Sequence, residues 1–160
     1  MIKIVGTNLE VFPLCLGGNV FGWSADESQS QGVLDAFTAS GGNFIDTADV
    51  YSEWVDGNVG GESETIIGNW MKSRGNRHSL VIATKVAKLS TRPGLRPENI
   101  IAACNDSLKR LQTDHIDLYY SHHDDKDVPI AETLGAYQTL ITEGKIRYIG
   151  ASQHIGARLQ

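Results

Sequence analysis

Three apolar segments of the sequence each end in a side chain that can bind or move a proton. Asp46 closes the run NFID, Lys85 closes VIATK and His122 closes HIDLYYSH, while Tyr51 follows Asp46 by five residues. A buried lysine needs a counter-ion because an unpaired buried charge is costly, and Asp46 is the natural partner. An ammonium beside a phenol favours loss of the phenol proton, so Lys85 would help Tyr51 to act as a general acid. With His122 orienting the same substrate oxygen, these residues predict machinery that protonates a carbonyl oxygen while another group attacks its carbon.

The elements that must position these residues alternate along the chain, after an expected N-terminal hairpin over residues 1–13. The expected strands cover residues 14–16, 43–47, 80–86, 115–121 and 146–151, and the expected helices cover residues 29–40, 62–73, 97–111 and 129–142. Strand–helix alternation predicts a parallel sheet with right-handed crossovers. No linker, low-complexity tract or change of composition divides the chain, so we expect residues 1–160 to form a single domain.

The places of the polar residues bear on which parallel-sheet architecture is present. The loop GGNVFG over residues 17–22 does not match the G-x-G-x-x-G fingerprint of dinucleotide-binding folds, and the sequence contains no P-loop motif. Function at the carboxyl ends of the strands is typical of the (β/α)8 barrel. A doubly wound sheet shares this habit at its switch point, so the pattern favours the barrel without excluding the other fold.

Composition and charge argue against several functional classes. The formal net charge is -5, which provides no broad basic surface for nucleic acid. The apolar runs are much shorter than a membrane span, and the N-terminal sequence MIKIVGTNLEV lacks the apolar region of a signal peptide. Cys15 and Cys104 are far apart and form no C-x-x-C pair, which favours a reduced, cytoplasmic chain with no membrane partner. We expect Cys15 in the core of a strand and Cys104 on the apolar face of a helix.

The run HHDD over residues 122–125 could in principle supply metal ligands. Adjacent strand residues point to opposite faces of a sheet, and no further ligand cluster accompanies the run. A position in a pocket or loop is therefore the better interpretation of His123, and we expect no metal site.

Five segments, in order along the chain, resemble the aldo-keto reductase family. The segment VFPLCLGGNVFGW is similar to the hairpin exit and first barrel strand, and NFIDTADVYSEW to the segment with the catalytic aspartate and tyrosine. The segment GGESETIIGNWMKSRGNRHSLVIATKV is similar to the helix and strand that end in the catalytic lysine. SLKRLQTDHIDLYYSHHDD is similar to the strand that ends in the catalytic histidine, and GKIRYIGASQH to the strand that binds the nicotinamide carboxamide. The resemblance implies an α/β fold of (β/α)8 TIM barrel type, here an N-terminal portion with a β-hairpin and five parallel strands.

The same resemblance implies an NADPH-dependent oxidoreductase that reduces aldehydes or ketones to alcohols by hydride transfer. Tyr51 would donate the proton, Lys85 and Asp46 would tune it, and His122 would position the carbonyl group. The small-molecule carbonyl substrate would bind against Trp23, Trp54 and His123. Cofactor contacts would come from Gly18, Asn19, Val20, Asp46, Ser152 and Gln153. Gln153 stands where the family has asparagine, so its amide group is one methylene further from the backbone.

The length of the chain sets a second expectation. A complete barrel takes roughly 250 residues, so we expect strands six to eight to be absent from these 160 residues. Exposed sheet edges invite association, and we expect self-association through the open barrel edges. Two other interpretations stay open. One is a nicotinamide-binding regulatory subunit similar to potassium-channel β-subunits, and the other is an inactive truncated fragment.

Overall fold

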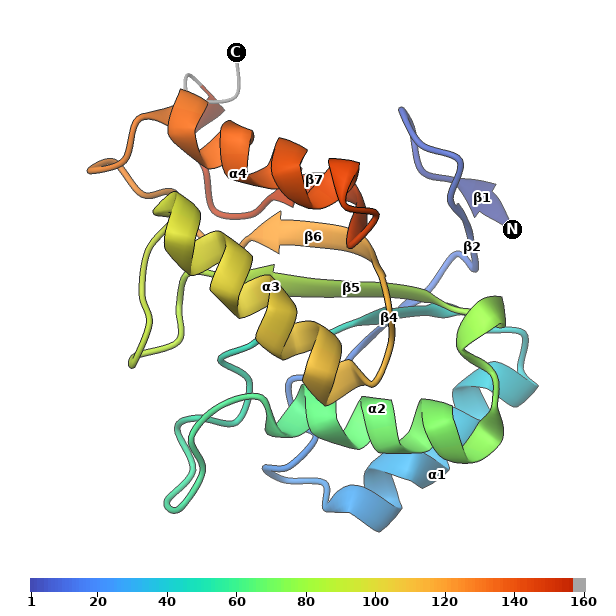
Figure 1. The fold of residues 1–160 in the computed structure, drawn as a ribbon. Coiled ribbons are helices and arrows are strands. Elements are labelled where there is room, and N and C mark those ends of the chain that lie inside the picture. The colour runs from blue at the N-terminus through green and yellow to red at the C-terminus, as the bar shows by residue number, and fades with distance from the viewer. Residues whose placement is uncertain (157–160) are drawn as a thin grey trace.

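A five-stranded parallel sheet with four helices along it forms the body of the protein (Figure 1). The computed structural model describes residues 1–156. The sheet strands are β3 (Cys15–Gly17), β4 (Phe44–Asp46), β5 (Val81–Val86), β6 (Ile116–Ser121) and β7 (Ile146–Ala151). The helices are α1 (Glu27–Ala39), α2 (Glu62–Arg74), α3 (Pro97–Leu111) and α4 (Ile130–Thr142), with a 3-10 turn η1 (Arg77–Ser79) before β5. An antiparallel hairpin, β1 (Ile2–Lys3) and β2 (Glu10–Val11), precedes them. The predicted hairpin and parallel sheet are thereby confirmed.

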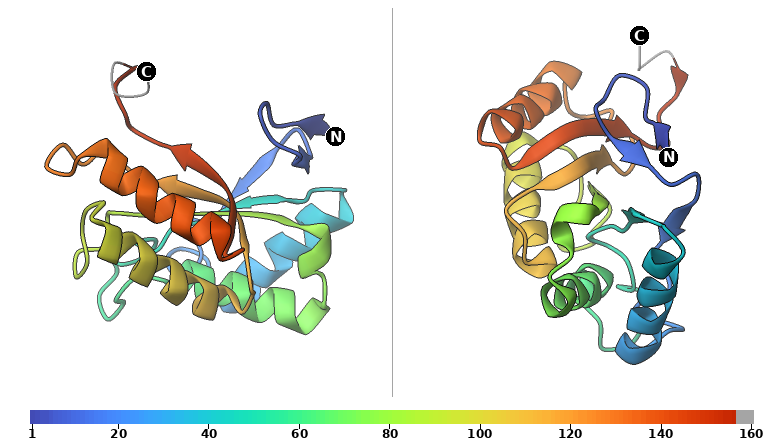
Figure 2. Two further views of the ribbon diagram at one scale, coloured as in Figure 1. Left: turned by 45° about the horizontal axis from the view of Figure 1, so that its top comes forward. Right: turned by 90° about the vertical axis from the view of Figure 1, so that its right-hand side faces the viewer.

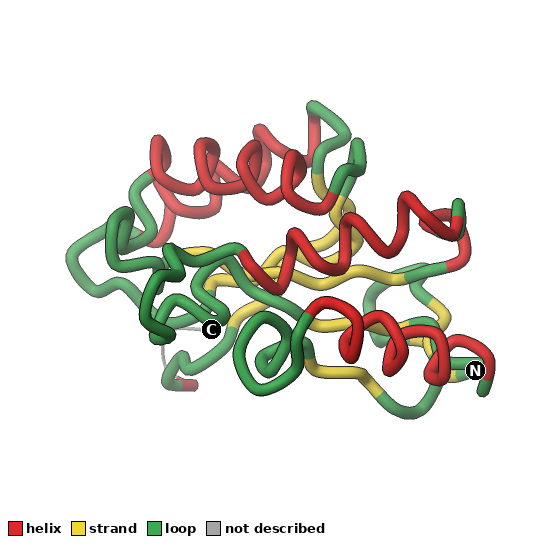
Figure 3. Tube along the Cα trace, turned by 90° about the horizontal axis from the view of Figure 1, so that it is seen from below, coloured by secondary structure: helices red, strands yellow, loops and turns green. Residues whose placement is uncertain are grey.

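The strands lie in the sheet in the same order as in the sequence, β3-β4-β5-β6-β7, and every neighbouring pair is parallel. All five strands therefore end at one edge, and the longer loops gather there (Figure 3). The register pairs Gly17 with Asp46 and Lys85 with Tyr120. Polar residues at the carboxyl ends of β4, β5 and β6 are consequently close together in space, as the strand-end pattern predicts.

The two faces of the sheet are covered differently (Figure 2). The helices cover one face, where Ile67 and Trp70 of α2 pack with Ile82, Leu111 and Tyr119 in the main core. The hairpin covers part of the other face, where Leu9 and Val11 pack against the inward side chains Val81, Ala83 and Leu118. Within residues 1–156 no helix has the length and apolar character needed to cross a membrane.

Of the two expectations about the cysteines, one is confirmed and one is wrong. Cys104 is buried on α3 as predicted, whereas Cys15 is exposed. Cys15 pairs with Phe44, whose side chain belongs to the hairpin side of the sheet, and β3 has a sheet neighbour on one side only. Cys15 therefore lies on an edge strand and on the face that the helices do not cover.

On residues 129–142, the spacing of Ile130, Leu134, Tyr137 and Ile141 predicts one apolar face, and the buried face of the helix is rotated from it. Ile130 and Leu134 of α4 are exposed, while Ala136, Tyr137 and Leu140 are buried. The Tyr137 hydroxyl reaches the Ser121 hydroxyl at 2.9 Å, and this buried contact fixes which side of α4 faces the sheet.

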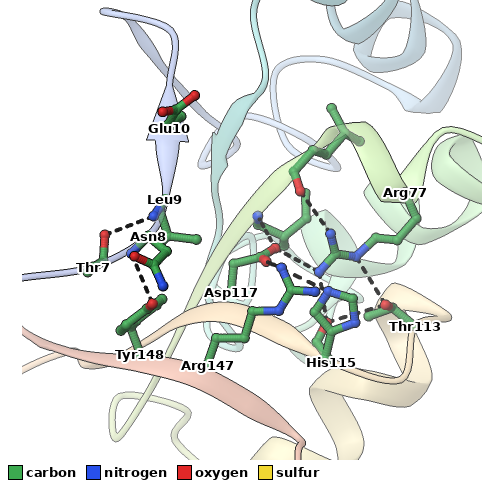
Figure 4. Close-up of polar contacts among 12 residues, drawn as sticks. Thr7, Asn8, Leu9, Glu10, Arg77, Thr113, His115, Asp117, Arg147 and Tyr148 are labelled. Atoms are coloured by element: carbon green, nitrogen blue, oxygen red, sulfur yellow. Dashed lines mark hydrogen bonds and ion pairs between the residues drawn. The ribbon is translucent and has the colours of Figure 1, made fainter. Parts of the chain in front are cut away.

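The amino-terminal end of the sheet is held by the carboxylate of Asp117, which is fully buried on β6 (Figure 4). Its Oδ2 accepts hydrogen bonds from Arg77 Nη2 at 2.7 Å and from the backbone N–H of Ile82 at 2.9 Å. Its Oδ1 accepts from Arg147 Nη1 at 2.8 Å. Asp117 thus links η1, β5 and β7, and both of its oxygens have cationic partners.

Candidate active site

Lys85 is the centre of the polar cluster at the carboxyl edge of the sheet. Its ammonium donates to Asp46 Oδ2 at 2.6 Å, to the Thr47 carbonyl at 2.7 Å and to the Tyr51 hydroxyl at 2.9 Å. The Lys85 side chain is 9% exposed and that of Asp46 is 25% exposed. These contacts account for all three N–H donors of the ammonium. The expected Lys85–Asp46 pair is present, and the Thr47 carbonyl is a partner that the sequence pattern did not indicate.

Tyr51 comes from the loop after β4, which folds back over the end of β5. The backbone N–H of Thr47 donates to the Ala83 carbonyl at 2.9 Å, and that of Asp49 donates to the Lys85 carbonyl at 3.2 Å. A turn then begins at Ala48, whose carbonyl accepts from the N–H of Tyr51 at 3.2 Å. The loop therefore extends the β4–β5 pairing by a few residues and places the phenol beside the lysine of the neighbouring strand.

His122 closes β6 next to Tyr51. Its backbone N–H donates to the Val86 carbonyl at 2.9 Å, and the rings of Tyr51 and His122 lie 5.9 Å apart, nearly perpendicular. Burial, with further contributions from the charges of Lys85 and Lys88, lowers the pKa of His122 to about 3. The imidazole is therefore neutral at physiological pH, and one of its two ring nitrogens can donate a hydrogen bond.

An aromatic wall borders the cluster on the side of the β3 and β4 loops. Trp23 and Trp54 meet edge to face with ring centroids 5.7 Å apart, and Trp54 lies 6.4 Å from Tyr51 in a similar geometry. Both tryptophans are about half exposed, at 53% and 51%. Large exposed apolar side chains beside a polar centre offer a surface for an apolar ligand. The structure thus brings these two predicted substrate residues together with Tyr51.

His123 lies elsewhere. Its side chain lines a groove with Pro93, Arg96 and Asp127 from the loops that follow β5 and β6. Adjacent residues at a strand end diverge, and His122 takes the position next to Tyr51. His123 therefore reaches a neighbouring groove, and its predicted contact with substrate stays a prediction.

The first of the two predicted cofactor segments follows β3. The backbone N–H of Gly18 donates to the Asp46 carbonyl at 2.7 Å, so the loop begins directly beside the end of β4. A Cβ at position 18 would approach Ser63 Oγ within 2.8 Å, which is closer than real Cβ contacts. Glycine is therefore required for this close packing. Asn19 is exposed, and Val20 packs against the main core.

The second predicted cofactor segment follows β7. The backbone N–H of Ser152 donates to the Ser121 carbonyl at 2.9 Å, which extends the β6–β7 pairing towards the site. Gln153 adopts a left-handed backbone conformation with φ 55, and its Oε1 accepts a hydrogen bond from Lys88 Nζ at 3.0 Å. Lys88, three residues after Lys85, was not among the predicted site residues, because nothing in its local sequence indicates contact with a segment 65 residues away.

The sequence pattern also gave no indication of a buried acidic group, Asp49, in the loop that carries Tyr51. Asp49 is 1% exposed, and neither carboxyl oxygen has a hydrogen-bond partner within residues 1–156. Burial, reinforced by the charge of Glu64, raises the pKa of Asp49 to about 7. Glu64 itself is satisfied, since it accepts from Thr84 Oγ1 at 2.5 Å and from Arg110 Nε at 2.6 Å. In the sequence, Asp49 resembles an ordinary loop carboxylate.

Comparisons with known proteins bear on the family of the chain. The Aldo/keto reductase family model matches residues 13–160. The chain is 40% identical to an uncharacterised oxidoreductase, YrpG, of Bacillus subtilis, over 96% of the chain and 49% of that protein. It is 34% identical to an aryl-alcohol dehydrogenase [NADP(+)] of Phanerodontia chrysosporium, over 92% of the chain and 42% of that protein.

A solved structure gives the same answer for the fold. The holo form of an aldo-keto reductase from Bacillus halodurans superposes with a TM-score of 0.82 at 34% identity, covering 95% of this chain and 49% of that one. The chain spans about half the length of these relatives. The strand order, the hairpin and the family match agree, and the chain belongs to the aldo/keto reductase family of oxidoreductases, of which it represents an N-terminal portion of the barrel.

Proposed function

We propose that the protein reduces the carbonyl group of aldehydes or ketones to an alcohol with NADPH as hydride donor, and that Tyr51 donates the proton. The observation that carries this proposal is the contact of one ammonium, Lys85 Nζ, with both the Asp46 carboxylate and the Tyr51 hydroxyl. Charge stabilisation and proton donation are thereby combined at a single partly open site.

The hydrogen bonds define the direction of proton transfer. An ammonium can only donate, so the Tyr51 oxygen accepts from Lys85 and its own O–H is left for another acceptor. Lys85 stabilises the negative charge that develops on the phenol oxygen as the proton leaves. Asp46 accepts from Lys85 Nζ at 2.6 Å and thereby holds the ammonium in place beside Tyr51.

His122 orients the substrate oxygen in this proposal. Its Nδ1 is buried without a hydrogen-bond partner within residues 1–156. A buried N–H without an acceptor is unfavourable, so the proton of the neutral ring belongs on Nε2. Nε2–H can then donate to the carbonyl oxygen beside Tyr51 and hold it for protonation.

The cofactor-facing residues have donor and acceptor groups that fit a nicotinamide. Because Lys88 donates to Gln153 Oε1, the Gln153 amide N–H2 is left to donate to a carboxamide oxygen. Ser152 supplies a hydroxyl next to it, and the Asp46 carboxylate can accept from a ribose hydroxyl. When bound, the nicotinamide would supply the hydride for the carbonyl carbon. The choice of NADPH is supported by the name of the Phanerodontia relative, which specifies NADP(+).

Tyr51→Phe tests the proposal. This change removes one hydroxyl and keeps the ring that contacts Trp54 and His122. In the longest natural form of the protein, we expect NADPH oxidation with aromatic aldehydes to fall by about 100- to 10,000-fold, the usual contribution of a general acid. The midpoint temperature of thermal unfolding of Tyr51→Phe should be nearly the same as that of the parent protein. Turnover undiminished in Tyr51→Phe would exclude the role given to Tyr51, and absence of turnover in the parent protein would exclude the reductase function.

A further inference from the structure

Lys88 links the ends of the two strands that flank β6. It lies two residues after β5, and its ammonium contacts Gln153, two residues after β7. In the sheet, β5 and β7 lie on either side of β6. The contact therefore passes over the carboxyl end of β6, where His122 is located, and borders the site on the side away from the Trp23–Trp54 wall.

The charge of Lys88 has no carboxylate partner among residues 1–156, in contrast to that of Lys85. The only hydrogen-bond acceptor of its ammonium in this part of the chain is the neutral amide of Gln153. Glu53, on the catalytic loop, has its carboxylate engaged by the backbone N–H and hydroxyl of Ser90. The positive charge of Lys88 is thus available to a ligand, and its influence on His122 places it near the reacting groups.

The backbone that carries Lys88 is well anchored. Ala87 is fully buried in an unusual conformation with φ 110, and its carbonyl accepts from the N–H of Gly94 at 2.9 Å. The Ser90–Glu53 contacts connect the same loop to the segment that carries Tyr51. A lysine on a backbone held in this way keeps its direction relative to the site, which reduces the entropy lost when it binds a ligand.

We propose that Lys88 binds a carboxylate group of the substrate, so that the site prefers carbonyl compounds with an apolar body and a carboxylate at the far end. This inference rests on the proposed reductase function. The carbonyl oxygen would lie between Tyr51 and His122, the apolar body against the tryptophan wall, and the carboxylate at the ammonium beyond His122. Lys88 is then a residue that determines specificity, with no part in the proton transfer itself.

Two matched probes test this preference. 4-Formylbenzoate and 4-formylbenzamide have the same ring and aldehyde and differ in the charge of one group. Their binding is measured by quenching of tryptophan fluorescence, because Trp23 and Trp54 border the site. We expect the parent protein to bind the carboxylate about three- to fivefold more tightly than the amide at low salt, the range for a partly exposed ion pair. This preference should weaken at high salt.

The variants separate charge from hydrogen bonding. Lys88→Gln can still donate to Gln153 but has no charge, and it should bring the affinity ratio of the two probes close to one. Lys88→Arg keeps the charge and should retain the preference. A ratio that is unchanged in Lys88→Gln overturns the inference. So does a Lys88→Gln variant that loses NADPH affinity and keeps the probe preference, since Lys88 would then serve the cofactor.

Failure of the proposed function and failure of the inference about Lys88 give different experimental results. The binding ratio is measured without turnover, whereas the reductase function is measured by NADPH oxidation with 4-formylbenzamide and its loss in Tyr51→Phe. A reductase without the carboxylate preference refutes the inference about Lys88 alone. Selective binding without reduction of either aldehyde refutes the proposed function.

Discussion

The sheet has a carboxylate–cation cluster at each end, and the two clusters are built differently. At the amino-terminal end, Asp117 is fully buried and its two oxygens accept from two arginines and one backbone N–H (Figure 4). At the carboxyl end, the Asp46 carboxylate is one-quarter exposed, and the lysine that it contacts also donates to a phenol. His122 beside it keeps a buried ring nitrogen without a partner in the described chain.

The two clusters differ in whether their hydrogen-bonding groups all have partners in the protein. Both oxygens of the Asp117 carboxylate have strong hydrogen-bond partners in the protein, which is what a cluster that holds elements together requires. In the Lys85 cluster, the Tyr51 hydroxyl accepts from Lys85 and keeps its own O–H, and the His122 ring makes no hydrogen bond within residues 1–156, so these groups are left for a ligand oxygen. This division matches the general habit of barrel folds, in which the carboxyl ends of the strands carry function and the opposite ends carry stability.

The largest effect on stability is expected at the amino-terminal cluster. Asp117→Ala removes the carboxylate that accepts from Arg77, Arg147 and the N–H of Ile82. Breaking a buried ion pair on one side typically costs about 3–5 kcal/mol, and we expect a loss of this size in the free energy of unfolding, measured by urea denaturation. Asp35→Ala breaks the exposed Arg74–Asp35 pair and should cost less than about 1 kcal/mol. Equal losses in the two variants would contradict the structural role of Asp117.

The next largest effect on stability is expected at Asp49, the buried acid in the loop that carries Tyr51. Asp49 ionises near pH 4 in an unfolded chain, whereas burial raises the pKa of the folded carboxyl to about 7. Stability is therefore lost as the pH rises from about 4 to about 7, and the full penalty applies above that range. Asp49→Asn should raise the free energy of unfolding by about 4 kcal/mol at pH 8 and change it little at pH 4.

Denaturation of both proteins across this pH range checks that expectation. Asp56→Asn changes an exposed carboxylate in the same loop and should produce no such pH-dependent gain. A difference between Asp49→Asn and the parent protein that stays constant with pH would mean that the Asp49 carboxyl has the same pKa in the folded and unfolded chains, which contradicts the effect of burial.

The smallest stability effect is expected at the Lys85 cluster at the carboxyl end of the sheet. In Lys85→Met the methionine fills a similar space, and the Asp46 carboxylate left behind is already one-quarter exposed to water. We expect the free energy of unfolding to change by about 1 kcal/mol or less, as for partly exposed ion pairs, while reductase activity is lost. A destabilisation as large as that of Asp117→Ala would remove the distinction between the two ends of the sheet.

Much of the carboxyl end could be predicted from the sequence, because its residues follow apolar strands directly. Asp46, Lys85 and His122 each mark a strand end, and parallel strands place their ends at one edge. The pairing of Lys85 with Asp46 followed from the cost of a buried charge. The family resemblance supplied the expected roles, and the strand order and hairpin agree with it.

The amino-terminal cluster and the support of the loops could not be predicted. Asp117 lies within an apolar strand, and its partners come from residues 30 to 40 positions away, which no local pattern connects. Lys88 and Gln153 meet only because the sheet places β5 and β7 on either side of β6. The exposure of Cys15 depends on the face of an edge strand, and a stretch of three residues has too short a pattern to specify the face.

The strand order has a consequence for how the protein can be made. Within residues 1–156, the strands β4 to β7 each pair with the sheet strand that precedes them in the sequence, so none of these four pairings needs a later segment. During synthesis, a chain can therefore add one strand–helix unit at a time to an existing edge, as domains generally form from the N-terminus onward. Asp46, Tyr51, Lys85 and His122 would be brought together as soon as β6 docks on β5. Hydrogen-exchange labelling during refolding, with earlier protection in β4 and β5 than in β7, would detect this order of assembly.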